Sequence, residues 1–93
     1  MSPSSERTVL LPADLHARPA GQLSRVAAGF GSRPITLIAG GKEVDARSVL
    51  LVMQLGATKG TEVTVRAVGD DAEQAVETLA GMLAAVTPVD ASA

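Results

Sequence analysis

The segment from Thr61 to Val68 places the strongest constraint on the fold of this chain. Apolar and polar residues alternate along it. The apolar positions are Val63, Val65 and Ala67, and the polar positions are Glu62, Thr64 and Arg66. This period of two is typical of a strand in a sheet that is covered on one face only. The chain must therefore supply further strands and an apolar layer to cover that face.

Two segments have the apolar spacing of helices that can form this layer. The first runs from Ala17 to Phe30, and its stripe consists of Ala20, Leu23, Val26, Ala27 and Phe30. The stripe of the last helix consists of Ala72, Ala75, Val76, Leu79, Met82, Leu83 and Val86. Spacings of three and four place each set on one helical face. Asp71 and Gln74 predict a capping box at the start of the last helix.

Three shorter segments have the character of strands. Glu6 to Leu11 contains β-branched residues and stops at Pro12, which has no N–H group for a sheet. Ile35 to Ala39 and Lys42 to Asp45 flank the Gly40-Gly41 pair, and two glycines can adopt the positive φ angles of a tight turn. The second and third segments therefore predict a β-hairpin.

The run between Ser48 and Gly56 is apolar at nearly every position and leaves two interpretations open. One is a short helix with Ser48 as its N-cap and Gly56 at its end, and the other is a buried strand. The order of elements indicates βαββαβα. One antiparallel sheet with the helices on one face buries every apolar stripe, so the predicted architecture is an open α/β sandwich.

Length and composition exclude several classes of protein. Ninety-three residues correspond to a single domain, 1–93, with an expected ordered core of about 6–86 and flexible ends at 1–5 and 87–93. A net charge of -2 and one aromatic residue, Phe30, argue against nucleic-acid binding. No cysteine and one histidine argue against disulfides and metal sites. No apolar run approaches membrane-spanning length, so we expect a cytoplasmic protein without membrane insertion.

The only histidine, His16, lies where the first predicted helix begins. Pro19 is tolerated in a first helical turn, which places His16 at or beside the N-cap. The amides of Ala17 and Arg18 and the Arg18 guanidinium could then hold an anion attached to the imidazole. The positive end of the helix favours the neutral ring, which is a nucleophile. Spacing alone, however, favours a histidine that only satisfies a local hydrogen bond.

Two motifs resemble those of a known family. Leu15-His16-Ala17-Arg18-Pro19-Ala20 resembles the active-site motif of HPr, the histidine-containing phosphocarrier of the bacterial phosphoenolpyruvate-dependent sugar phosphotransferase system. Arg47-Ser48-Val49-Leu50-Leu51-Val52-Met53-Gln54-Leu55-Gly56 resembles its second motif, a basic residue and a serine before a short apolar helix that ends at glycine. The motifs stand at the family's separation, and the resemblance runs from about Glu6 to Val86. It implies an α+β, HPr-like open-faced sandwich with a four-stranded antiparallel sheet and three helices on one face.

The resemblance also implies a function. His16 would accept a phosphoryl group on Nδ1 from phosphorylated Enzyme I and pass it to the IIA domain of a sugar permease, with Arg18 and the Ala17 and Arg18 amides holding the phosphate. The chain would be a carrier without its own turnover or cofactor, and we expect a monomer. Ser48 corresponds to a serine that, in many Gram-positive members, HPr kinase phosphorylates to signal to a catabolite-control transcription factor. A simple capping role for Ser48 is an equal alternative.

A docking surface for the partner proteins is implied as well. Its residues would be Ala20, Arg25, Leu50, Leu51, Gln54 and Leu55. A helix of about two turns cannot bury every apolar residue of the Ser48 to Gly56 run, so Leu50 and Leu51 are expected at the surface and Val49 and Val52 in the core. Arg25 matches a basic family position that would face acidic partners.

Three departures from the family pattern leave the partners open. Asp14 stands where the family usually has glycine, and we expect it to bring negative charge beside the phosphate, which would favour the protonated ring or weaken phosphate binding. Ala28 replaces a common lysine, and Gln54 a small hydroxyl residue. These changes suit a specialised paralogue serving nitrogen regulation or dihydroxyacetone kinase as well as a general sugar carrier. Two further alternatives are a small phosphatase using His16, and a regulator acting through Ser48 with His16 idle.

Overall fold

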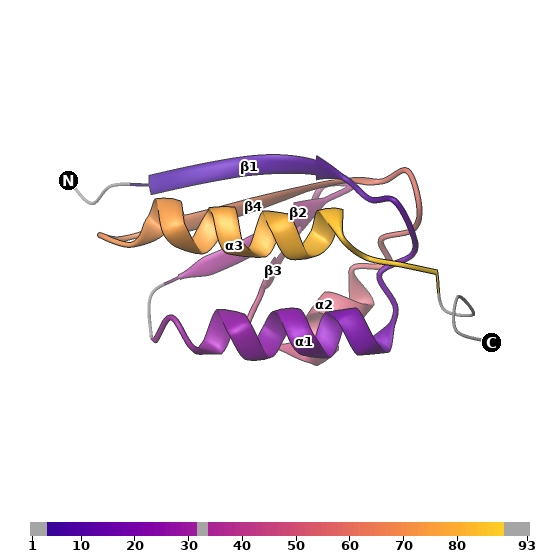
Figure 1. The fold of residues 1–93 in the computed structure, drawn as a ribbon, viewed down its shortest axis with the longest axis horizontal. Coiled ribbons are helices and arrows are strands. Elements are labelled where there is room, and N and C mark those ends of the chain that lie inside the picture. The colour runs from indigo at the N-terminus through magenta and orange to yellow at the C-terminus, as the bar shows by residue number, and fades with distance from the viewer. Residues whose placement is uncertain (1–3, 32–33, 89–93) are drawn as a thin grey trace.

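The computed structural model describes residues 4–31 and 34–88 (Figure 1). The elements within them are β1 (Ser4–Leu10), α1 (Ala17–Ala28), β2 (Ile35–Ala39), β3 (Lys42–Asp45), α2 (Val49–Gln54), β4 (Glu62–Val68) and α3 (Ala72–Ala84). The predicted βαββαβα order is confirmed, and the second apolar run forms a helix rather than a buried strand. β1 begins at Ser4, earlier than the expected ordered core. The ends predicted to be flexible fall partly outside the described residues, at 1–3 and 89–93.

The strands form one antiparallel sheet in the order β1-β4-β2-β3. The predicted hairpin joins β2 and β3, with Ala39 opposite Lys42. Gly40 and Gly41 have φ angles of 57° and 81°. Glycine adopts such angles without steric cost, and two of them in succession match the right-handed twist of the paired strands.

The helices cover the face of the sheet that the β4 pattern predicts to be apolar. In β4, Val63, Val65 and Ala67 are fully buried. α3 packs on β1 and β4, α1 lies against both α3 and α2, and α2 contacts β3 (Figure 1). The largest fully buried side chains are Leu11, Leu23, Ile35, Leu37, Val52, Val63, Val65, Val76, Leu79 and Leu83. Burying each of them contributes roughly 1.5–3 kcal/mol before the loss of chain entropy is counted.

The predicted capping box of α3 is wrong. Asp71 is the N-cap residue, but its side chain makes no cap hydrogen bond. Its backbone angles, φ -100° and ψ 20°, lie outside the extended region from which an N-cap side chain folds back onto the first turn.

Three elements meet at one end of the sheet. β1 ends there, α1 begins there, and α3 runs antiparallel to α1 so that its last turn ends there too (right side of Figure 1). The segments 11–16 and 85–88, far apart in the sequence, are thereby brought side by side.

Candidate functional site

His16 is the N-cap residue of α1. Its backbone is extended, with φ -88° and ψ -173°, and its carbonyl accepts the first hydrogen bond of the helix from Ala20 N at 3.0 Å. The amides of Ala17 and Arg18 precede that bond, so they have no partner within the helix. The imidazole makes no cap hydrogen bond either. The first turn of α1 therefore has two backbone N–H donors, those of Ala17 and Arg18, to which the His16 ring is not hydrogen-bonded.

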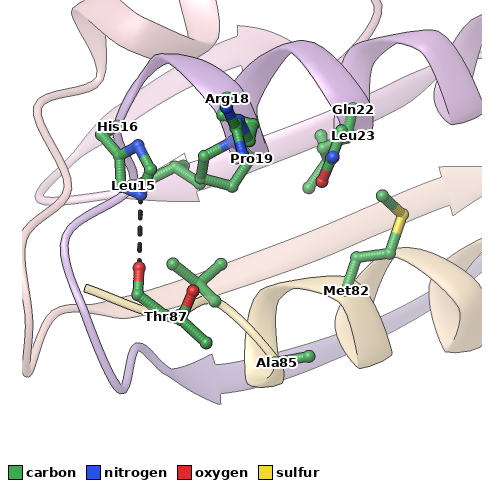
Figure 2. A pocket seen from close by; sticks show the side chains of 10 residues that line it. Leu15, His16, Arg18, Pro19, Gln22, Leu23, Met82, Ala85 and Thr87 are labelled. Atoms are coloured by element: carbon green, nitrogen blue, oxygen red, sulfur yellow. Dashed lines mark hydrogen bonds between the residues drawn. The ribbon is translucent and has the colours of Figure 1, made fainter. Parts of the chain in front are cut away.

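The His16 ring is held from the other side by the segment that follows α3. Nε2 lies 3.2 Å from the carbonyl oxygen of Thr87, and the side chain is partly exposed (Figure 2). A carbonyl oxygen only accepts, so this bond requires the hydrogen on Nε2. In the neutral ring, Nδ1 then carries the lone pair. The contact joins residues 71 positions apart, and no pattern in the sequence indicated it.

A cavity of about 230 Å³ lies beside the ring, between the start of α1 and the end of α3 (Figure 2). Its polar lining comes from His16, Arg18, Gln22 and Thr87, and its apolar lining includes Leu23 and Met82. Arg18 is exposed, and its guanidinium makes no hydrogen bond or ion pair with the residues that the structure describes. The site therefore has space for an anion. It also has a cation, the Arg18 guanidinium, that no other described residue occupies.

The loop that carries His16 is bonded to the turn before β4. The backbone bonds are Leu11 N to Thr61 O at 2.9 Å, Gly60 N to Leu11 O at 2.9 Å and Leu15 N to Ala57 O at 3.0 Å. One oxygen of Asp14, Oδ1, also accepts from Lys59 N at 2.8 Å. This bond directs the carboxylate to the 57–61 turn, a contact that no pattern in the sequence indicates.

Ser48 caps α2, as one interpretation of the sequence predicted. Its Oγ accepts from Leu51 N at 3.2 Å. The preceding Arg47 binds Asp45 through two side-chain contacts, Nε to Oδ1 at 3.2 Å and Nη2 to Oδ2 at 3.1 Å. These hydrogen bonds lower the pKa of Asp45 and raise that of Arg47. Arg47, the basic residue of the second motif, is therefore paired with Asp45 of β3 and not with a residue of α2.

The outer side of α2 is an exposed apolar surface, which we call the α2 patch. It consists of Val49, Leu50, Leu51 and Met53, with exposed fractions of 42, 63, 38 and 45 %. The expectation that Val49 is buried is wrong, and Met53 was not anticipated. A Cβ placed on Gly21 of α1 would lie 4.0 Å from a methyl group of Val49, so the patch adjoins the exposed side of α1.

The remaining expected docking residues divide by burial. Arg25 and Gln54 are exposed. Ala20 and Leu55 are 0 and 6 % exposed and belong to the core, so their side chains offer no surface for a partner, and that expectation is wrong. Val52 of α2 and the C-cap residue Leu55 both face inward, which confirms the core assignment of Val52.

Within residues 4–31 and 34–88, no group of three or more His, Cys, Asp or Glu side chains is arranged to hold a metal ion. No helix of those segments is long and apolar enough to cross a membrane.

Comparison with known proteins points to one family. The model of the PTS HPr component phosphorylation site matches residues 3–85. The chain is 43 % identical over 65 residues to the phosphocarrier protein HPr of Mycoplasma capricolum, covering 70 % of this chain and 72 % of that protein. It is 38 % identical over 80 residues to HPr of Haemophilus influenzae, covering 86 and 93 %. The crystal structure of HPr from Bacillus anthracis superposes with a TM-score of 0.76 at 32 % identity, covering 86 % of this chain and 96 % of that one.

Proposed function

The chain belongs to the HPr family of phosphocarrier proteins of the bacterial phosphotransferase system, and we propose that it carries phosphoryl groups on Nδ1 of His16. Phosphorylated Enzyme I is the proposed donor and a IIA domain the proposed acceptor, both in the cytoplasm. The hydrogen bond from Nε2 to Thr87 O is the observation that best supports this assignment, because it leaves the lone pair of the neutral ring on Nδ1.

The proposed transfer needs no proton movement within the carrier. The Nδ1 lone pair attacks phosphorus, the bond from phosphorus to the donor Enzyme I breaks, and its electron pair returns to the donor. The product keeps the hydrogen on Nε2, so the ring becomes an imidazolium that bears the phosphoryl group. Thr87 O then accepts from a charged donor, which strengthens that bond. A cationic ring is a good leaving group, so the phosphoryl group stays transferable.

The phosphoryl oxygens need donors that are already in place. We assign this role to the amides of Ala17 and Arg18, which have no partner within α1, and to the Arg18 guanidinium. The site is open to solvent, so a second protein can reach the same phosphorus atom from outside.

The α2 patch and the exposed side of α1 are the proposed docking surface. Apolar side chains at its centre and arginines at its edge suit partners with an apolar, acidic surface. Arg18 and Arg25, two helical turns apart, line a shallow hollow over Gly21. Arg25 and Gln54 remain in this proposal, whereas Ala20 and Leu55 leave it because they are buried.

Ser48 is a proposed regulatory site for HPr kinase. Phosphate on Oγ would place about -2 charges next to the α2 patch and weaken the docking of acidic partners. The test uses Ser48→Asn, because asparagine keeps a cap acceptor and has no hydroxyl to phosphorylate. We expect the kinase to label the wild type and not this variant. Labelling of the variant to the same extent would assign the modification to another residue.

Labelled phosphoenolpyruvate and Enzyme I test the main proposal. We expect acid-labile phosphate on the wild type, none on His16→Ala with an unchanged circular dichroism spectrum, and transfer to an added IIA domain. An unlabelled wild type would leave His16 idle, as in a pure regulator, and steady release of inorganic phosphate would indicate a phosphatase. Parallel assays with sugar-specific, nitrogen-regulatory and dihydroxyacetone-kinase acceptors distinguish a general carrier from a specialised one.

A further inference from the structure

The loop between β1 and α1 carries the proposed acceptor but forms neither helix nor strand. Among the described residues, its backbone bonds to the 57–61 turn through Leu11 and Leu15. Pro12 has no N–H group to contribute between them. The last residues before His16 therefore depend on few backbone contacts for their position.

Asp14 adds a contact that the backbone does not supply. Its Oδ1 accepts from Lys59 N at 2.8 Å, and its carbonyl accepts from His16 N at 3.0 Å. One residue thus connects the 57–61 turn to the residue that bears the reacting ring.

We propose that Asp14 is a positioning residue of the phosphoryl-transfer site, acting through its bond to Lys59 N. This inference rests on the proposed role of His16. Nδ1 has to meet the donor phosphorus while the Ala17 and Arg18 amides meet the phosphoryl oxygens, and such alignment is sensitive to displacements of about 1 Å. The carboxylate contacts the turn and not the reacting atoms, so its effect passes through the backbone of residues 14–16.

Three variants separate the hydrogen bond from charge. Asp14→Ala removes the acceptor, and Asp14→Asn removes the charge but keeps an oxygen at the Oδ1 position. Asp70→Ala is the matched control for net charge, because Asp70 is exposed in the connection between β4 and α3, at the opposite end of β4 from the 57–61 turn.

Two measurements report on the variants. Amide hydrogen exchange at Lys59 reports the bond itself. We expect it to accelerate about 2- to 10-fold in Asp14→Ala, the range that one net hydrogen bond predicts, and to stay within about twofold of wild type in Asp14→Asn and Asp70→Ala. In phosphorylation by Enzyme I, we expect Asp14→Ala to lower kcat by a similar factor without changing KM, because the docking surface is untouched.

Several outcomes would overturn the inference. Unchanged amide exchange at Lys59 in Asp14→Ala would show that the hydrogen bond does not protect this amide. Accelerated exchange with an unchanged kcat would show that the bond exists but does not position the site. Equal losses of kcat in Asp14→Asn and Asp14→Ala would assign the effect to charge near the site, and an equal loss in Asp70→Ala to net charge. If the wild type accepts no phosphate, the proposed function fails, and the ¹⁵N shifts of the His16 ring then decide: unchanged shifts in Asp14→Ala show that Asp14 does not position the ring.

Discussion

Replacing Ser24 by alanine is expected to stabilise the protein. Ser24 lies on the inner side of α1 and is 5 % exposed, and its Oγ has no hydrogen-bond partner among the described residues. A buried hydroxyl without a partner costs roughly 1–3 kcal/mol. Alanine also has the higher helix propensity, by a few tenths of a kcal/mol. Part of this gain is offset because removing Oγ leaves a small void, so we expect a net stabilisation of about 1 kcal/mol.

The same substitution at Ser48 is the matched control and has the opposite sign. Ser48 Oγ accepts from Leu51 N, so Ser48→Ala leaves the first turn of α2 without its cap. Loss of a serine N-cap costs about 1 kcal/mol. For a domain of this size, a change of about 1 kcal/mol moves Tm by roughly 4–8 °C. Ser24→Ala is therefore expected to raise Tm by several degrees, and Ser48→Ala to lower it by a similar amount.

Urea and thermal unfolding followed by circular dichroism measure both variants against the wild type. An unchanged urea m-value shows that the comparison concerns the native state rather than the compactness of the unfolded chain. The phosphorylation rate by Enzyme I should be unaffected in Ser24→Ala, because Ser24 lies away from His16 on the inner side of α1. A Ser24→Ala variant less stable than wild type would refute the assignment of Ser24 as an unsatisfied buried group.

Three further predictions concern charge, docking and the ring. The Arg47 hydrogen bonds hold the pKa of Asp45 below its ordinary value of 3.8, so Arg47→Ala should lower Tm at neutral pH. This difference should begin to shrink below about pH 4, where Asp45 becomes protonated in the unfolded chain, and it should disappear below the lowered pKa of Asp45 in the folded wild type; a constant difference down to pH 2 would contradict it. Leu50→Ser should weaken binding to Enzyme I about 5- to 30-fold at unchanged Tm, whereas Leu10→Ser, at a residue equally exposed, should not; equal effects in a binding assay would remove the α2 patch from the interface. With the ring neutral, ¹⁵N spectra of His16 should show the Nε2–H tautomer almost alone, and a large Nδ1–H fraction would contradict the role of Thr87.

The periodicity of apolar residues predicted most of the fold, because each long helix or strand buries one face and exposes the other. The alternation in β4 corresponds to buried positions, and so does the predicted stripe of the last helix except for Met82, which is partly buried. α2 is different, since its six residues are nearly all apolar. In so short a helix, the α1 and β3 neighbours decide which residues face inward, and a sequence read by itself does not contain those neighbours. The apolar pattern by itself therefore predicts Val49 in the core, although it is 42 % exposed.

The sequence predicted only those parts of the candidate site that are formed by residues close together in the chain. His16 as N-cap and Arg18 in the first turn follow from the position of Pro19, because helix starts depend on a few adjacent residues. Thr87 and Lys59 contribute backbone groups from 71 and 45 positions away. Every residue has a carbonyl, and every residue except proline has an N–H, so no residue type marks these partners.

Two segments distant in the sequence contact the region of the His16 ring, one through Thr87 O and the other through Lys59 N. The segment that follows α3 contacts Nε2 of the ring through Thr87 O, which favours the hydrogen on Nε2, and the 57–61 turn contacts the backbone before the ring through Lys59 N and Asp14. A histidine at a helix start lies beside free backbone amides that can bind an anion, but its ring can rotate and exchange tautomers. Both freedoms are reduced here by contacts that the sheet and α3 bring to one end of the molecule. In the proposed mechanism, the motif therefore supplies the nucleophile and the anion donors, and the fold around it selects Nδ1.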